Sequence, residues 1–236
     1  MKILLELNDI YCGYGAEDVL QNISLKVAVG EFLCIAGPNG SGKSTLLKAI
    51  ARLLPCRGSI TINNKEINSF SHKDIAKHIA LLGQASPLYF PYTVYDTVAM
   101  GRYAHSKGWF GSLDKTDKAA IESAIVTMNL DDIQNELISE LSGGQLQRVF
   151  LARTLAQDPK IILLDEPTNH LDSKNQITLL DHLAAWVREK ERAIIAVFHD
   201  LNLARRYCTT AALMEEGAIA SQGTAELVYN CTIEQL

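Results

Sequence analysis

The sequence is 236 residues long, which is enough to bury the core of one large α/β domain or of a main domain with an inserted subdomain. Its formal net charge of −5 argues against the broad basic surface of a nucleic-acid-binding protein, so we expect no nucleic-acid partner. The five cysteines are odd in number and include no C-x-x-C pair, which argues against a disulfide framework or a zinc cluster and favours a reduced compartment.

No segment of the sequence predicts insertion into a membrane. Glu6 interrupts the first apolar residues before a signal core could form, and no run reaches the ~18 apolar residues that span a bilayer. We therefore expect that a partner holds the protein at any membrane where it acts. Residues 217–236 are expected to contain only a short hairpin and a helix, without room for a further regulatory domain.

The first part of the chain is predicted to form mostly strands. Alternating apolar residues at 3–10 and 23–29 indicate strands buried on one face, and the continuous apolar run at 32–36 indicates a strand buried on both faces. This run leads directly into a glycine-rich loop. Residues 43–54 are predicted to form a helix that Pro55 ends, and strands are expected at about 59–62 and 79–82.

Residues 87–158 have a helical pattern and are interpreted as a subdomain inserted into the core. Thr93 and Asp96 fit a capping box, and residues 115–128 indicate a further helix. Apolar runs at 161–164 and 193–198 then indicate buried parallel strands, separated by a helix over 173–189. We therefore predict one domain over residues 1–236, with the core at 1–86 and 159–236 and the helical subdomain at 87–158.

A phosphate-binding loop is predicted after the strand at 32–36. Its residues fit G-x-x-x-x-G-K-S/T between a buried strand and a helix, and they are Gly37, Pro38, Asn39, Gly40, Ser41, Gly42, Lys43 and Ser44, followed by Thr45 in the expected nucleotide-binding set. Glycines allow backbone N–H groups to converge on phosphate oxygens. We expect Lys43 to contact the β- and γ-phosphates and the Ser44 hydroxyl to bind Mg²⁺. The alternative is an ordinary glycine turn with a surface lysine.

An acidic pair, Asp165 and Glu166, directly follows the predicted strand at 161–164. Open α/β sheets place their ligands at the carboxyl ends of their strands. We expect Asp165 to hold Mg²⁺ through the water shell of the metal, and Glu166 to act as the general base for an attacking water. Alone, such a pair could be a helix-capping turn. Together with the phosphate loop, it indicates nucleotide hydrolysis.

The most distinctive motif is Leu141-Ser142-Gly143-Gly144-Gln145. From the residues alone, it predicts a helix start that Ser142 caps. In its order after the phosphate loop and before the acidic pair, it resembles the signature of the ATP-binding subunits of ABC transporters, where these residues close over ATP held by a second copy. The resemblance covers essentially the whole chain and implies that one chain carries two half-sites. A helix amino terminus is also suited to binding a γ-phosphate presented across an interface.

This resemblance implies a fold and further site residues. The fold class is α/β: a P-loop NTPase core with a mainly parallel sheet, an N-terminal antiparallel β subdomain and an inserted α-helical subdomain. Tyr14 resembles the aromatic residue that stacks on adenine, although Tyr11 is close enough to compete. Gln84 matches the glutamine that links Mg²⁺ and the lytic water to the helical subdomain. His199 matches the histidine that contacts the γ-phosphate.

The segment Asn169-His170-Leu171-Asp172 resembles the loop that contacts the opposite subunit. Its first two residues differ from the Ser-Ala form that is common in the family, whereas the last two are retained. The resemblance therefore implies a role at the nucleotide for Asp172, and no role is carried over to His170.

The resemblance also implies a mechanism. Two copies close around two ATP molecules with Mg²⁺, hydrolysis reopens the homodimer, and integral-membrane permease subunits hold it at the cytoplasmic face of the inner membrane, with a substrate-binding protein as an indirect partner. Residues 90–102 and 199–204 resemble importers of iron-siderophore complexes, haem, vitamin B12 or related metal chelates. The alternative is a soluble ABC ATPase that acts as an assembly scaffold of the iron–sulfur cluster type. The cargo is not encoded here, because an ATP-hydrolysing subunit need not contact it.

Overall fold

The computed structural model describes residues 2–15, 17–83, 91–106, 113–169, 171–198 and 200–226. The strands are β1 (Ile3–Tyr14), β2 (Glu17–Ala28), β3 (Phe32–Ala36), β4 (Cys56–Ile62), β5 (Lys65–Glu66), β6 (Ile79–Leu82), β7 (Ile161–Asp165), β8 (Ala193–Val197), β9 (Thr210–Glu215) and β10 (Ala218–Thr224). The α-helices are α1 (Lys43–Ile50), α2 (His72–Ala76), α3 (Val94–Ala99), α4 (Lys115–Thr127), α5 (Gly143–Ala156), α6 (Ser173–Arg188) and α7 (Leu201–Tyr207). Short 3-10 helices are η1 (Ile67–Ser69), η2 (Met100–Ala104), η3 (Asp131–Ile133) and η4 (Ile138–Glu140).

The larger sheet has the strand order β10-β9-β3-β8-β7-β6. Its strands β9, β3, β8, β7 and β6 are parallel, and β10 pairs antiparallel with β9. β3 and β8 are buried along their whole length, as expected for parallel strands covered on both faces. Because parallel strands end at the same edge, the loops that follow β3 and β7 leave the sheet on the same side.

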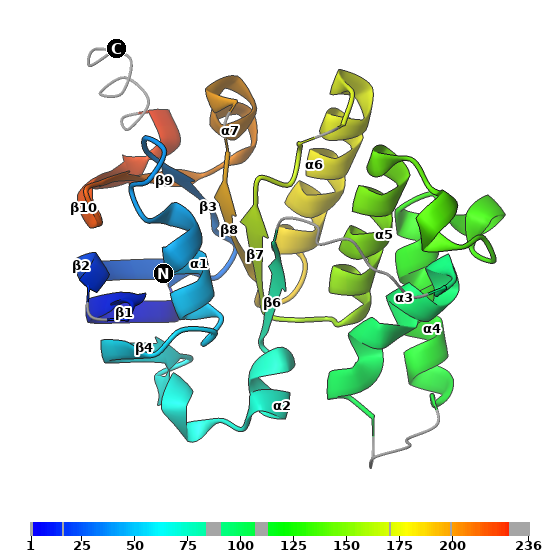
Figure 1. Cartoon of the computed structure of the whole chain (residues 1–236), viewed down its shortest axis with the longest axis horizontal. Helices are drawn as coiled ribbons and strands as arrows, with labels where there is room; N and C mark the ends of the chain where they lie inside the picture. Colours follow the sequence, from blue (N-terminus) through cyan, green and yellow to red (C-terminus); the bar gives the residue numbers. More distant parts are fainter. Residues whose placement is uncertain are drawn as a thin grey trace.

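The smaller sheet is antiparallel, with the order β2-β1-β4-β5. It lies on one side of the larger sheet, and α3, α4 and α5 lie on the other (Figure 1). Helix α1 packs between the two sheets, because Leu46 and Leu47 share a buried apolar cluster with Leu7 of β1 and Leu33 of β3. The phosphate loop is therefore held by both sheets.

The helices between β6 and β7 form a second packed unit over the same sheet. Val98 of α3, Ile121 of α4 and Leu151 of α5 are fully buried in a cluster that also contains strand residues of β7. A buried ion pair joins Arg102 of η2 to Asp117 of α4 at 2.8 Å, and the Arg102 guanidinium also donates to a carbonyl of α5. The position of α5 is thus fixed from several directions.

The structure confirms the predicted fold class and changes one helix boundary. Helix α1 ends at Ile50 rather than continuing to residue 54. Arg52 has φ 56°, its N–H donates to Ala49, and the N–H of Leu53 donates to Lys48, which is the hydrogen-bond pattern of a Schellman turn. Such turns usually contain glycine, and because this one has Arg52 instead, no residue before Pro55 indicates the end of the helix. The predicted domain boundaries stay a prediction, since residues 84–90 lie outside the described part.

Among the described residues, no helix combines the length and the apolar character that crossing a bilayer requires.

Candidate active site

The loop between β3 and α1 has a backbone that favours glycine at three positions. Gly37 has φ 143°, Gly40 has φ 83° and Gly42 has φ 99°, a region that residues with a Cβ rarely adopt. A Cβ on Gly37 would also lie 2.2 Å from the backbone oxygen of Met214 in β9. The loop therefore lies directly against the neighbouring strand, and this packing requires glycine at position 37.

The Lys43 side chain closes this loop. Its Nζ donates to the carbonyl oxygens of Gly37 at 2.8 Å and of Pro38 at 2.7 Å. Burial lowers the pKa of Lys43, and the nearby carboxylates of Glu166 and Asp165 oppose that shift. The structure thus brings the predicted phosphate-binding lysine and the acidic pair together at the carboxyl edge of the sheet. We call this group, with the loop at 37–44, the phosphate centre.

Asp165 is the last residue of β7 and lies beside Val197 of β8. Its Oδ1 atom is buried and has no hydrogen-bond partner among the described residues. The Ser41 hydroxyl of the loop is also buried and unpaired within the same part of the chain. Buried polar atoms in folded proteins nearly always have partners, so both atoms indicate that the phosphate centre is shaped for a ligand.

The residues of the phosphate centre fit a magnesium ion that is shared with phosphate. Mg²⁺ prefers oxygen ligands and keeps several waters, so it needs only one or two protein groups. Asp165 Oδ1 is an unpaired carboxylate oxygen, and Ser44 is exposed at the start of α1. No cluster of three or more His, Cys, Asp or Glu in the described ranges could hold a metal alone. A metal here would therefore take its other ligands from water and phosphate.

Glu166 has φ 56°, which is uncommon for a residue other than glycine. Its N–H donates to the Val197 carbonyl at 3.2 Å, and its Oε2 accepts a hydrogen bond from Asn169 Nδ2. The turn that begins at Glu166 thus fixes the carboxylate at the end of β7. In the sequence, Asn169 is notable only because it departs from the family pattern. Its hydrogen bond to Glu166 could therefore not be predicted.

The signature residues form the amino terminus of α5, as their pattern predicts. Ser142 Oγ accepts a hydrogen bond from Gln145 N at 3.3 Å, and Gln145 Oε1 accepts one from Ser142 N at 2.9 Å, so the two residues form a capping box. This geometry leaves the N–H groups of Gly143 and Gly144 without acceptors inside the helix. Such free N–H groups, at the positive end of a helix, favour a bound anion.

An open hollow of about 540 Å³ surrounds this helix start. We call it the signature hollow, and it is lined by Ser142, Gly143, Gly144, Gln145, Arg148, Leu171, Asp172 and Asn175. Asp172 caps α6 by accepting hydrogen bonds from Asn175 N at 2.8 Å and from Asn175 Nδ2 at 2.9 Å. The structure therefore joins the predicted Asp172 to the signature motif and adds Arg148 and Asn175, which the sequence did not single out.

The signature hollow and the phosphate centre are separate places on the described chain. No residue that lines the hollow belongs to the loop at 37–44 or to the acidic pair. The two groups that the sequence assigns to one ATP molecule are thus not assembled within one chain. This separation is what two half-sites on a single protomer would produce.

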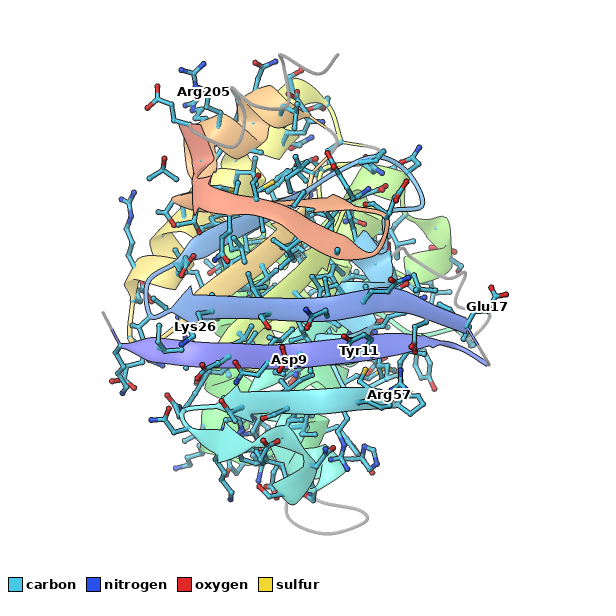
Figure 2. All side chains as sticks on the ribbon, turned by 90° about the vertical axis from the view of Figure 1, so that its left-hand side faces the viewer. Asp9, Tyr11, Glu17, Lys26, Arg57 and Arg205 are labelled. Carbon is cyan, nitrogen blue, oxygen red and sulfur yellow. The ribbon has the colours of Figure 1, made fainter. Side chains whose placement is uncertain are left out.

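Tyr14 and Tyr11 lie in different surroundings. Tyr14 is 53% exposed at the end of β1, and Lys48 of α1 donates to its hydroxyl at 3.2 Å. Tyr11 is half-buried, and the Arg57 guanidinium of β4 lies 5.4 Å from its ring centroid (Figure 2). Tyr14 therefore contacts the helix that follows the phosphate loop, and the choice between Tyr14 and Tyr11 as the adenine-stacking residue stays a prediction.

Gln84 and His199 lie outside the described residues, and so does His170. The roles that the sequence assigns to Gln84 and His199 remain predictions. The strands β6 and β8 are both parallel neighbours of β7, so they end at the same edge of the sheet as Asp165.

Comparisons with known proteins agree with this geometry. A family model described as ABC transporter matches residues 20–169. The chain is 40% identical over 223 residues to the ferric enterobactin transport ATP-binding protein FepC of Escherichia coli (strain K12), which covers 92% of this chain and 82% of that protein. It is 38% identical over 231 residues to the petrobactin import ATP-binding protein FpuD of Bacillus anthracis. This match covers 98% of this chain and 84% of that protein. Among solved structures, the chain is similar to a dimeric, post-hydrolysis structure of the ATP-binding cassette MJ0796 bound to ADP and Pi, with a TM-score of 0.82 and 28% sequence identity. This match covers 94% of this chain and 99% of that chain.

The phosphate loop and the acidic pair at the strand ends define a P-loop nucleotide-binding protein. The chain belongs to the ABC transporter family. It is an ATP-binding ATPase of that family, as the motifs predicted.

Proposed function

We propose that this chain is the Mg²⁺-dependent ATPase subunit of an importer for metal chelates, such as iron-siderophore complexes, haem or vitamin B12. Two copies act together at the cytoplasmic face of the membrane, where permease subunits hold them and a substrate-binding protein delivers the cargo. The names of its relatives support the siderophore part of the proposal, since they include import proteins for ferric enterobactin, petrobactin and iron(3+)-hydroxamate.

The separation of the signature hollow from the phosphate centre carries the dimer proposal. Lys43 and the acidic pair are together on the chain, and the signature motif forms a different, exposed surface with Asp172. A second copy can bring its signature hollow to the phosphate centre of the first. The relative whose cassette was solved as a dimer supports this arrangement.

Each residue of the phosphate centre has a proposed role in binding ATP. The loop N–H groups and Lys43 hold the phosphates, with Lys43 exchanging the carbonyls of Gly37 and Pro38 for phosphate oxygens. Ser44 and Asp165 hold Mg²⁺, together with Gln84. When bound, the metal neutralises the charge that develops on the phosphate oxygens.

Glu166 is the proposed general base. Its carboxylate stands at the carboxyl end of β7, near the Lys43 ammonium that contacts the phosphates, so it can orient and deprotonate the attacking water. His199 is proposed to hold the γ-phosphate. From the partner chain, Gly143 and Gly144 provide N–H donors for the charge on that phosphate.

The permease is proposed to dock beside η2. Met100, within the segment 90–102 that resembles metal-chelate importers, is 38% exposed, and Tyr103, directly after that segment, is 74% exposed. Lys73 of α2 lies 5.9 Å from the Tyr103 ring centroid and donates to the Ser106 carbonyl. This contact joins the core to the helical region at the proposed docking surface.

Substituting Glu166 tests the mechanism. Glu166→Gln should lower ATP turnover about 1,000-fold, since general-base groups contribute about 10²–10⁴-fold, while ATP binding and dimer closure persist. A sizing column with ATP should then show an accumulated dimer. Glu122→Gln, on the exposed face of α4, is the matched control and should behave as wild type. An unchanged turnover, or an ATP-independent monomer, would refute the assignment of Glu166.

The import proposal has a separate test. Purified from its own cells, the chain should remain with detergent-solubilised membranes in a complex with permease subunits, and the complex should contain a metal chelate. A chain that stays entirely in the soluble fraction would instead support an assembly scaffold.

A further inference from the structure

Two glutamine side chains from different helices hold the turn that follows Glu166. Gln147 Nε2 of α5 donates to the Pro167 carbonyl at 3.2 Å. Gln176 Nε2 of α6 donates to the Thr168 carbonyl at 3.1 Å. Pro167 and Thr168 are both buried, so the backbone of this turn depends on partners from inside the protein.

This turn controls the direction of the Glu166 carboxylate. Glu166 has a left-handed backbone with φ 56°, which persists only when the surrounding structure holds it. Asn169, at the other end of the turn, donates from its backbone to the Glu166 carbonyl at 3.2 Å and from its side chain to Oε2. A shift of the Pro167 carbonyl would therefore move the backbone next to Glu166 and, with it, the carboxylate.

The two glutamines differ in what else their helices carry. Gln147 lies in the second turn of α5, and the same helix begins at Ser142 with the signature residues. At the far end of α5, Gln157 donates to the carbonyls of Ala76 and Ile79, which ties the helix to the core beside β6. The Gln147 hydrogen bond thus connects α5 to the core at a second point, close to the signature. Helix α6 carries no residue of the signature motif, although Asp172 and Asn175 at its start also line the signature hollow.

We propose that Gln147 is a positioning residue that couples the signature of a chain to the Glu166 carboxylate of the same chain. The inference rests on the proposed function, in which the signature binds ATP held by the partner and Glu166 acts on ATP held by its own chain. Docking of the partner's ATP on the amino terminus of α5 then fixes the Pro167 carbonyl through Gln147. The Gln147 amide is thus a direct side-chain link between the two reaction centres of a dimer within each protomer.

Gln147→Met and Gln176→Met test this coupling as a matched pair. Methionine keeps an unbranched side chain of similar length and removes the donor, and each variant loses one hydrogen bond to the same turn. Gln147→Met should lower kcat about 5-fold, with the KM for ATP unchanged within about 2-fold, which corresponds to the loss of roughly one hydrogen bond in the transition state alone. Gln176→Met should leave kcat within about 2-fold of wild type. The two variants should lower the melting temperature by similar amounts, because each loses one hydrogen bond to the same turn.

A double-mutant cycle with Glu166→Gln shows whether Gln147 acts through Glu166. If it does, adding Gln147→Met to Glu166→Gln should change the residual single-turnover rate by less than about 2-fold, because the group that Gln147 positions is already lost. The double variant should also form the ATP-dependent dimer as readily as Glu166→Gln alone, since the signature residues are intact.

The outcomes separate this inference from the function on which it rests. Equal kcat losses in Gln147→Met and Gln176→Met, a wild-type kcat in Gln147→Met, or a further 5-fold loss in the double variant would overturn the coupling role. Wild-type turnover in Glu166→Gln would instead overturn the proposed function, whatever Gln147 does.

Discussion

The phosphate centre and the signature hollow are built in opposite ways. The phosphate centre lies at the ends of β3 and β7, and within the described residues it contains a lysine that donates to loop carbonyls and two buried oxygens without partners, on Ser41 and Asp165. The signature hollow is open to solvent, and its side chains pair with one another through the capping box of α5 and the N-cap of α6. The phosphate centre thus contains buried side-chain atoms without partners, whereas the signature hollow offers only the backbone N–H groups of a helix start.

This difference explains why both regions can exist in one folded chain. Buried polar groups without partners lower the stability of the folded chain, and a ligand that binds them raises it again. The phosphate centre therefore depends on ligand binding for part of its stability. A capped helix start costs nothing and can be offered to another molecule. Substitutions that change one region and leave the other intact should therefore separate ATP binding from ATP turnover.

The largest effect is expected from Gly143→Asp, which changes the signature hollow alone. A Cβ at Gly143 has open space within 4 Å, and an acidic residue in the first turn of a helix is favourable, so the variant should fold with an unchanged or higher melting temperature. Its carboxylate would face the partner's γ-phosphate, and such like-charge contacts cost several kcal/mol, so turnover should fall about 1,000-fold. ATP affinity of the monomer should stay within about 2-fold.

Lys115→Asp is the matched control for this substitution, because Lys115 is the first residue of α4, exposed and away from both regions. It should turn over ATP as wild type does. Weakened ATP binding by monomeric Gly143→Asp, measured by calorimetric titration, would show that the signature belongs to the same nucleotide site as Lys43, and the two-region description would then be wrong.

The second largest effect is expected from Lys43→Ala, which changes the phosphate centre alone. Removing a charged partner that is mostly buried costs roughly 2–5 kcal/mol, so ATP affinity should fall at least about 30-fold in a direct titration. The capping box of α5 should be unaffected. Lys118→Ala, on the exposed face of α4, provides the same substitution without a predicted effect. Unchanged affinity in Lys43→Ala would contradict the assignment of the loop.

Local patterns predicted most of the phosphate centre. The runs at 32–36, 161–164 and 193–198 are apolar throughout, and each is a buried parallel strand in the structure. The positions of Lys43 and Asp165 follow from these strands, because parallel neighbours end at one edge. The signature capping box could also be predicted, since both of its partners lie within four residues of each other.

Contacts between distant segments could not be predicted in this way. The Gln147 bond to Pro167 joins α5 to the turn after β7, and no periodicity marks a polar residue that reaches a backbone carbonyl. The end of α1 at Ile50 depends on a left-handed Arg52, where the sequence has no glycine. The different surroundings of Tyr11 and Tyr14 likewise depend on which strand or helix each ring contacts, and that is a property of the packed sheets.

The smallest effect is expected at Tyr14, and it sharpens the boundary of the phosphate centre. Stacking of a base on an aromatic ring is worth about 1–3 kcal/mol, and Tyr14 is exposed beside α1, so Tyr14→Ala should weaken ATP binding about 10-fold. Tyr14→Phe should keep most of the affinity, because the ring remains. Tyr11→Ala is the paired variant, and it should bind ATP within about 2-fold of wild type, since its ring lies against Arg57 on β4. The reverse result in the same titration would assign adenine stacking to Tyr11 and would extend the phosphate centre toward β4 instead of α1.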